Sequence, residues 1–307
     1  MSNSLNKTLI VSSLCGAIYV VLNTVLIGFS IPTLLLVLVV VAVFNISEKV
    51  RKLIVAFLPI ILFVLIYDFM RVYPNYMVNP IDTLGIYGME KTLFGISVDG
   101  EFMIPCEYFK QNHWSVLDIM SGIFYLCWVP LPIIYGLYLY FTNRRALCFR
   151  FTTAFLVVNL VGFSGYYIYP AAPPWYVMDF GFVPDHSIGG QVAGFAYFDE
   201  ITGLGVFKML YGKNANVFAA IPSLHSAYVP VALYYALRTK PSNFWLTLLI
   251  FVTIGIWFSA VYSGHHYIID VVLGVMCTIT GLCIFELLLM RIPLVRKGYE
   301  YVVKYLS

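Results

Sequence analysis

The sequence predicts an all-α integral membrane protein with about eight transmembrane helices. Of its 307 residues, 61% are hydrophobic and only 11% are charged, whereas an ordinary soluble domain is about 45–50% apolar and about 25% charged. Several apolar stretches also approach the length of about 20 residues that a helix needs to cross a bilayer. These spans must be helical, because unpaired backbone groups cannot face lipid.

The apolar stretches divide the chain into eight expected spans. They cover residues 8–28, 30–46, 53–70, 117–141, 147–168, 219–237, 243–262 and 267–290. The first is long for a signal peptide and has no clear small-residue cleavage site, so we expect a retained span. The second is the shortest and begins beside Pro32.

Basic residues set the expected orientation. With the N-terminus in the cytoplasm and eight alternating spans, 13 of the 18 Lys and Arg residues fall in inner segments, Lys240 among them. Only three of the 15 acidic residues fall in these inner segments. Lys213 is one of the five basic residues that fall in the outer segments. Lys and Arg favour cytoplasmic loops, so both termini are predicted to be cytoplasmic.

This topology divides the chain into three parts. Residues 1–50 form two N-terminal transmembrane helices, residues 51–290 form a six-helix membrane core, and residues 291–307 form a cytoplasmic tail. The core carries two long outer segments, 71–116 and 169–218, which are rich in Tyr, Phe, Pro and Gly. Such segments are typical of short interfacial helices with aromatic rings at headgroup depth.

Charge and cysteine usage exclude other classes of protein. A net charge of +3 gives no sign of a nucleic-acid surface. The six cysteines are scattered and form no C-x-x-C pair, so neither a disulfide framework nor a zinc site is indicated. We expect no cofactor and no metal.

Ionisable residues within spans are costly and indicate functional sites. His225 follows Pro-Ser-Leu about one turn into the sixth span, and His265, His266 and Asp270 open the eighth. The predicted topology places both groups at the outer face of the membrane, although the orientation came from residues of the inner loops.

A third polar group lies at the outer end of the third span. It consists of Asp68 and Arg71, spaced i, i+3. A structural ion pair and a functional role are equally open for this pair. A metal site is the less favoured explanation of the histidines, since only Asp68 could add a further acid to the three ligands.

His266 and Asp270 are spaced i, i+4 and would share one face of a helix. A carboxylate that accepts one ring N–H fixes the tautomer and leaves the other nitrogen nucleophilic. Ser263-Gly264 could cap this helix, and its first N–H groups, like those after Pro222-Ser223, could bind an anion. Two histidines and an aspartate at two helix starts predict phosphoryl transfer, although a single membrane histidine more often only bonds between helices.

These residues together resemble the type 2 phosphatidic acid phosphatase superfamily, whose motifs read K-x6-RP, PSGH and SR-x5-H-x3-D. Pro222-Ser223-Leu224-His225 matches the second motif, and Ser259 to Asp270 matches the spacing of the third. The departures are Ala260 for the arginine of the third motif, Leu224 for glycine, and Gly162 and Tyr169 for both basic residues of the first. With these departures the chain looks like the branch of inositol phosphorylceramide synthases.

The resemblance implies a mechanism and a set of substrates. His266 would be the nucleophile, Asp270 would orient it, and His225 would be the acid and base. A phosphoinositol-type head group would pass from a glycerophospholipid to ceramide through a phosphohistidine, without a metal. The partners would be these lipids and the bilayer, with no nucleic acid.

The missing basic residues leave the phosphoryl charge in need of donors. The expected substrate-binding residues are therefore Arg71, Asp68, His265, Tyr166, Tyr169 and Ser223. Arg71 is favoured as the cation. A transferase must also exclude water, and we expect residues 171–218 to fold over the site while lipids enter sideways between helices.

Two other functions stay open at this point. One is a lipid phosphate or polyprenyl diphosphate phosphatase of the same superfamily, and the other is a non-enzymatic lipid transporter or scaffold. The compact chain favours a bacterial cytoplasmic membrane with the site facing the periplasm, or a Golgi lumen in a eukaryote.

Overall fold

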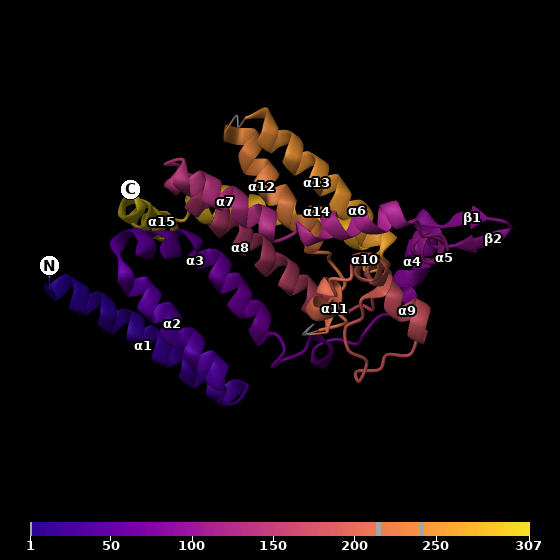
Figure 1. The fold of residues 1–307 in the computed structure, drawn as a ribbon, viewed down its shortest axis with the longest axis horizontal. Helices are drawn as coiled ribbons and strands as arrows, with labels where there is room; N and C mark the ends of the chain where they lie inside the picture. The colour runs from indigo at the N-terminus through magenta and orange to yellow at the C-terminus, as the bar shows by residue number, and fades with distance from the viewer. Residues whose placement is uncertain (1, 213–215, 240–241) are drawn as a thin grey trace.

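The computed structural model describes residues 2–212, 216–239 and 242–307, with side chains described from residue 7 onward (Figure 1). Lys213 and Lys240, which entered the charge count, lie outside the described residues. Apart from one small hairpin, the described elements are helices and loops, so the predicted fold class is confirmed.

A bundle of helices forms the core of the molecule, and its members match the last six predicted spans. Most of these helices pack against two or more of the others, and buried apolar side chains fill the space between them. The bundle consists of α3 (Glu48–Phe69), α6 (Ser115–Leu126), α7 (Pro130–Phe141), α8 (Arg145–Ile168), α12 (His225–Thr239), α13 (Asn243–Tyr262) and α14 (Ile268–Cys283).

Most of each predicted span is helical, but the helices differ in length. Five helices in the described chain are long and apolar enough to cross a membrane, and the pair α6 and α7 would add a sixth, bent by 46°. The bend falls just before Pro130, whose ring cannot continue a regular helix ladder. Two predicted spans lie on short helices: α2 (Ile31–Ile46) has 16 residues, close to its predicted extent, whereas α12 has 15 and begins six residues after the predicted start.

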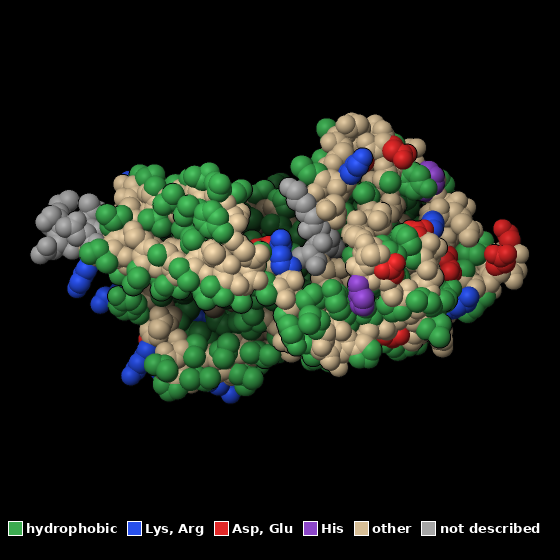
Figure 2. Space-filling model, turned by 90° about the horizontal axis from the view of Figure 1, so that it is seen from below, with side chains coloured by type: hydrophobic (Ala, Val, Ile, Leu, Met, Phe, Trp, Pro, Cys, Tyr) green, Lys and Arg blue, Asp and Glu red, His purple; other side chains and the backbone are tan. Residues whose placement is uncertain are grey.

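The two N-terminal helices pack on the side of the bundle. Helix α1 (Ser2–Leu26) runs beside α2, and α2 continues through Ser47 into α3 (Figure 1). Their side chains are mostly exposed and apolar, and such a surface suits lipid. Figure 2 shows hydrophobic side chains covering this part of the molecule and acidic side chains gathered at the opposite end.

The end of the bundle opposite the two long outer segments is tied by an ion pair and a terminal helix. After α14 the chain makes a π-turn, η3 (Ile284–Leu288), and a 3-10 turn, η4 (Leu289–Arg291). Within the π-turn Glu286 pairs with Arg150 and accepts a hydrogen bond from Tyr235 at 2.6 Å. The predicted tail is largely helix α15 (Pro293–Leu306), which packs against α8 and α3.

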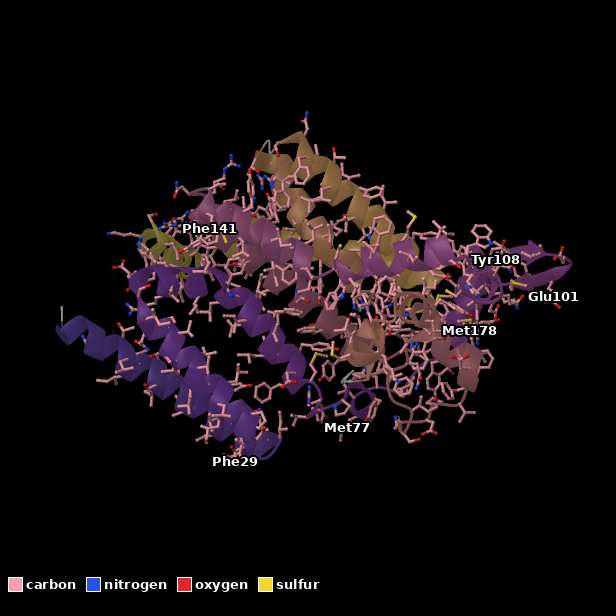
Figure 3. The ribbon with its side chains drawn as sticks, in the orientation of Figure 1. Phe29, Met77, Glu101, Tyr108, Phe141 and Met178 are labelled. Carbon is pink, nitrogen blue, oxygen red and sulfur yellow. The ribbon has the colours of Figure 1, made fainter. Side chains whose placement is uncertain are left out.

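The two long outer segments pack together at the other end of the molecule. In Figure 3, Glu101 and Tyr108 of the first segment and Met178 of the second lie at this end, and Phe141 of α7 lies far from them. Their elements are η1 (Asn75–Met77), α4 (Leu84–Phe94), β1 (Ile96–Val98), β2 (Glu101–Met103), α5 (Pro105–Gln111), α9 (Pro174–Phe180), η2 (Ala193–Phe195), α10 (Ala196–Thr202) and α11 (Val206–Tyr211).

Buried polar contacts join the outer segments to the core. The side-chain amide of Asn75, which is fully buried, donates to the backbone carbonyls of Tyr166 and Phe218, both at 2.9 Å. Backbone bridges connect Asp82 with Ala171 and Ala171 with Ala219. Residues far apart in the sequence are therefore fixed around the outer end of the bundle, where the predicted catalytic residues lie.

Candidate active site

His225, His266 and Asp270 meet where α12 and α14 begin. Nδ1 of His266 lies 3.3 Å from Oδ2 of Asp270, and Nε2 of the same ring lies 3.2 Å from Nδ1 of His225. His266 is 5% exposed and Asp270 is fully buried. The three residues thus form one continuous chain of polar contacts, as their spacing suggested.

The local geometry differs from the expected one. Helix α14 begins at Ile268, so His266 precedes the helix rather than sharing its face. Tyr267 is extended, with φ −67° and ψ 159°, and its N–H donates to Oδ2 of Asp270 at 2.9 Å. The expected cap at Ser263-Gly264 is wrong, because Ser263 ends α13 and Tyr267 caps α14. His225 is likewise the first residue of α12, not one turn into it.

The starts of the two helices are joined through Ser223. Its backbone N–H donates to the backbone carbonyl of Asp270 at 3.0 Å, and its hydroxyl accepts from Ser226 at 3.0 Å. The helices approach so closely that a Cβ on Gly274 would lie 2.1 Å from the carbonyl oxygen of Ser223. Ser223 is fully buried, so its observed contacts are structural.

A cavity of about 240 Å³ opens beside the two histidines. Its walls are mainly aromatic and apolar, as in many ligand pockets. They include Phe63, Tyr67, Tyr125, Trp128, Tyr166, Trp175, Phe207, Tyr211, Leu224, His225, Tyr228, His265 and His266. Burial lowers the pKa of His266 to about 4, so its ring is neutral near pH 7, as a nitrogen nucleophile must be.

The outer segment between Ala171 and Phe218 covers this cavity, as predicted. Pro173, Trp175, Phe207, Leu210 and Val217 all line it. Trp175 is held in place by its backbone N–H, which donates to Gly264 at 2.9 Å. The segment thus supplies much of the apolar wall that would keep water from the histidines.

The predicted substrate-binding residues fall into two groups. Tyr166 and His265 line the cavity, and the ring of His265 contacts the hydroxyl of Ser263 at 3.1 Å. Asp68, Arg71 and Tyr169 are not among the lining residues. Arg71 forms an exposed ion pair with Asp68, and the Tyr169 hydroxyl donates to Asp82.

The lining residues that the structure describes include no Lys or Arg. The start of α14 does not replace them, because its first amides already have partners. Ile268 and Ile269 donate to the carboxylate of Glu90 at 2.9 Å and 3.1 Å. The expected anion site at this helix start is therefore wrong.

Two departures from the superfamily motifs contact each other. Gly162, at the position of a motif lysine, faces Leu224, at the position of a motif glycine. A Cβ on Gly162 would lie 2.3 Å from Cδ2 of Leu224. Leu224 is 3% exposed and fills the space in which a side chain at position 162 would begin.

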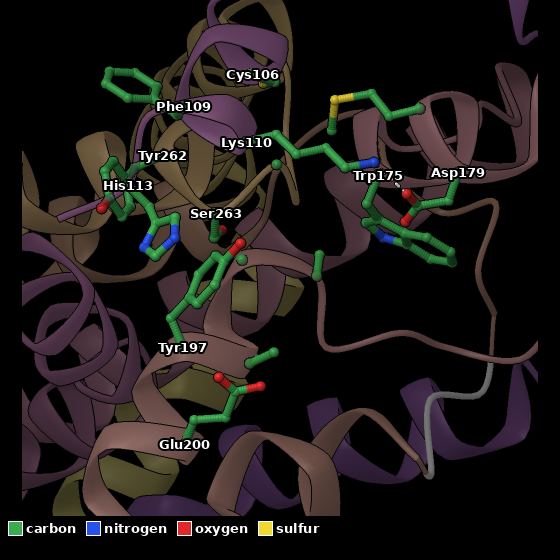
Figure 4. Close-up of a pocket in the computed structure, with 15 residues that line it drawn as sticks. Cys106, Phe109, Lys110, His113, Trp175, Asp179, Tyr197, Glu200, Tyr262 and Ser263 are labelled. Atoms are coloured by element: carbon green, nitrogen blue, oxygen red, sulfur yellow. Dashed lines mark hydrogen bonds and ion pairs between the residues drawn. The ribbon is translucent and has the colours of Figure 1, made fainter. Parts of the chain in front are cut away.

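A second cavity of about 260 Å³ is also lined by Trp175 (Figure 4). Two ion pairs lie at its wall: Lys110 pairs with Asp179, and His113 pairs with Asp118 at 3.2 Å. The ring of His113 also stacks on Tyr197 with a centroid separation of 3.6 Å. His225, His266 and Asp270 do not line this cavity, so the aromatic cavity is the candidate active site.

Sequence reasoning missed several residues around the site. Tyr125 and Trp128 flank His225, with ring centroids 4.9 Å and 4.5 Å away. Glu90 and Cys106 support the backbone near His266. Glu90 carried a usable signal, because a carboxylate one turn from Ile86 falls on the buried face of its helix.

The arrangement provides a nucleophile and a proton carrier in one apolar site. If Asp270 accepts the Nδ1–H of His266, Nε2 carries a lone pair that accepts from Nδ1 of His225 until a substrate takes the place of this contact. A phosphorus atom bound there would have an attacking nitrogen on one ring and a proton donor on the other. No solved structure matches the chain.

Comparisons with known sequences identify the family of the chain. The sequence model of the PAP2 superfamily matches residues 96–284. A phosphoinositol dihydroceramide synthase of Bacteroides thetaiotaomicron is 48% identical over 95% of each chain.

Fungal proteins are similar at greater distance. The inositol phosphorylceramide synthase catalytic subunit AUR1 of Saccharomyces cerevisiae is 26% identical over 71% of this chain and 52% of its own. The inositol phosphorylceramide synthase of Candida albicans is 27% identical over 54% of this chain and 35% of its own. The chain therefore belongs to the PAP2 superfamily and is a homologue of inositol phosphorylceramide synthases.

Proposed function

We propose that this membrane protein transfers a phosphoinositol-type head group from a glycerophospholipid to a ceramide-type acceptor. The contact between His266 and His225 at 3.2 Å, with Asp270 on the far side of His266, carries the proposal. The substrates are inferred from the names of the relatives, since an apolar aromatic wall is common to many lipid-binding cavities.

In the first half-reaction, Nε2 of His266 attacks phosphorus and the bond to the diacylglycerol oxygen breaks. His225, protonated beside the phosphodiester anion, gives its proton to that oxygen. The products are neutral diacylglycerol and a phosphoinositol group on His266. Asp270 stabilises the positive charge that develops on the ring, and also holds its orientation.

The second half-reaction regenerates the protein. The primary hydroxyl of the acceptor attacks the phosphohistidine while His225 removes the hydroxyl proton. The N–P bond breaks and the head group is released on the acceptor. Because the same histidine gives and takes one proton, no net proton is gained or lost.

Exclusion of water would keep this cycle a transfer rather than a hydrolysis. The apolar wall from the outer segment, including Trp175 and Phe207, lies over the histidines. We propose that the lipids enter sideways between helices, with their chains remaining in the bilayer.

Arg71 is our candidate for the cation that the cavity lacks. Tyr67, four residues earlier along the chain, lines the cavity, so a short movement of the end of α3 would bring the guanidinium towards bound phosphate. In this proposal Asp68 holds Arg71 until the lipid binds, and His265 and Tyr166 provide neutral hydrogen bonds.

We also propose that the site faces the periplasm of a bacterial cytoplasmic membrane, with both termini in the cytoplasm. The distribution of Lys and Arg supports this orientation. Residues 1–50 would serve as two accessory spans beside a catalytic core of residues 51–290.

The deciding experiment uses purified protein, labelled phosphatidylinositol and ceramide, with lipid products identified by mass spectrometry. We expect a phosphoinositol-ceramide that is absent with His266→Ala and His225→Ala. Acid-labile phosphate on His266 should accumulate when the acceptor is omitted. Release of inositol phosphate as the main product in the presence of ceramide would indicate a phosphatase instead.

A further inference from the structure

A buried carboxylate from the first outer segment holds the start of the catalytic helix. Glu90 on α4 is fully buried. Its Oε1 accepts the backbone N–H of Ile268 at 2.9 Å and its Oε2 accepts that of Ile269 at 3.1 Å. These are the first two residues of α14, the helix that carries Asp270.

The first turn of a helix has backbone N–H groups without intrahelical partners, and something must satisfy them when they are buried. Here two carboxylates accept hydrogen bonds from these N–H groups. Asp270 takes the N–H of Tyr267 at 2.9 Å, and Glu90 takes the next two. The contacts with Glu90 therefore fix the rotation of the turn from which the Asp270 carboxylate reaches His266.

The same outer segment also holds the other side of the catalytic turn. The thiol of Cys106, just inside α5, donates to the backbone carbonyl of His266 at 3.5 Å, and both residues are buried. Glu90 and Cys106 thus contact the backbone on either side of Tyr267. Small movements of this backbone would change the separation of His266 from Asp270 directly.

A buried carboxylate caps a helix only at a high cost in desolvation free energy. None of the ion pairs among the described side chains includes Glu90, and burying a carboxylate without a cation is costly. Burial raises the pKa of Glu90, whereas the amides of Ile268 and Ile269 lower it. A serine or asparagine at the cap would satisfy one amide at lower cost, but would not hold two amides from a separate segment.

We propose that Glu90 is a positioning residue for phosphoryl transfer, acting through the first turn of α14 on the contact between Asp270 and His266. The inference rests on the proposed function for its reaction, and on the two carboxylate contacts for its geometry. It assigns a catalytic purpose to the outer segment 71–116 beyond covering the bundle.

The test compares Glu90→Gln with Glu90→Ala. The glutamine keeps the shape but turns one acceptor oxygen into an NH₂ group that faces a backbone N–H. We expect kcat to fall roughly 10- to 100-fold with Gln and further with Ala, because about 1 Å of misplacement can cost about 10²-fold. KM for the lipid donor should change less than about twofold, since Glu90 does not line the cavity.

Glu286→Gln is the matched control, since Glu286 is a second buried carboxylate, in the π-turn at the opposite end of the same helix. It should lower Tm at least as much as Glu90→Gln while leaving kcat within about twofold. An equal loss of kcat in both variants would mean that Glu90 matters only for stability, and would overturn the proposal.

Hydrogen exchange makes the geometry testable without any assumption about the substrate. The amides of Ile268 and Ile269 should lose protection in Glu90→Gln and keep it in Glu286→Gln. Lost protection with unchanged transfer would overturn the positioning role. If the wild-type protein moves a different head group, only the proposed substrate fails, and the kcat comparison is then made with that lipid.

Discussion

Gly274→Ala is expected to separate the two helix starts that bring the histidines together. Gly274 lies on α14, one turn after Asp270, and faces the backbone of Ser223 two residues before His225. The added Cβ would lie 2.1 Å from the carbonyl oxygen of Ser223 and 3.1 Å from its carbonyl carbon. Neither backbone can yield as a flexible side chain would, so the two segments must move apart.

The size of the effect follows from this distance. A carbon and a carbonyl oxygen require about 3.2 Å or more, since optimal nonbonded contacts are near 3.5 Å. The segments must therefore separate by roughly 1 Å, and a displacement of that size can cost about 10²-fold in rate. We expect kcat to fall about 100-fold, with a loss of stability of about 1–3 kcal/mol from overpacking.

Gly281→Ala separates the catalytic effect from the packing effect. Gly281 is on the same helix, two turns nearer the inner end, and its Cβ would lie 2.7 Å from Cα of Val158 on α8. Both variants should lower Tm in detergent, as followed by thermal unfolding. Only Gly274→Ala should reduce head-group transfer to labelled ceramide. Full activity of Gly274→Ala, or equal losses in the two variants, would refute the reasoning.

The remaining predictions concern charge and packing in and near the site. Burial lowers the pKa of His266 from 6.5 to about 4, so its neutral form persists down to that pH. The fall of kcat/KM in acid that is due to His266 should therefore lie below about pH 5. A fall near pH 6.5 would contradict the role of His266 as the nucleophile. The same shift means that the unfolded chain binds the extra proton first, so stability should rise with pH between about 4 and 6.5. Arg71→Ala should lower kcat/KM by at least about 10²-fold if its guanidinium reaches the phosphoryl oxygens, whereas turnover within a few-fold of wild type would remove it from the mechanism. Leu224→Ala should lower stability by about 2–5 kcal/mol. Gly162→Ala should be destabilising alone but much less so in the Leu224→Ala background, and a double-mutant cycle of Tm would measure the difference. Additive effects would mean that the two positions are not coupled.

The transmembrane architecture could be predicted because lipid imposes one dominant rule on sequence. A span must be apolar and helical, so most of each predicted stretch is helical, with residues 117–141 divided between α6 and α7. Length was less predictable. Residues 219–224, which precede α12, are as apolar as a span but form a buried turn that carries His225 into the site. Hydropathy does not distinguish burial in protein from burial in lipid.

The catalytic trio could be predicted because its chemistry restricts residue type and spacing. Supporting contacts carry no such pattern. Glu90 lies 178 positions before Ile268, and Asn75 lies 91 before Tyr166. Both side chains bond to backbone atoms, and a backbone atom does not restrict which residue type stands at the partner position. The helix start at Ile268 therefore suggested an anion site, although a carboxylate from elsewhere in the chain already occupies it.

The departures at Gly162 and Leu224 can be understood only together. Taken separately, Gly162 is the loss of a cation, and Leu224 is a larger side chain than the motif glycine with no evident reason. In the structure the leucine side chain occupies the space next to the glycine, so a lysine could not be restored at position 162 while Leu224 is present. The exchange replaces a charged phosphate ligand with apolar wall beside His225. A cavity altered in this way has a more apolar wall and excludes water better, and a transfer between two lipids requires that exclusion.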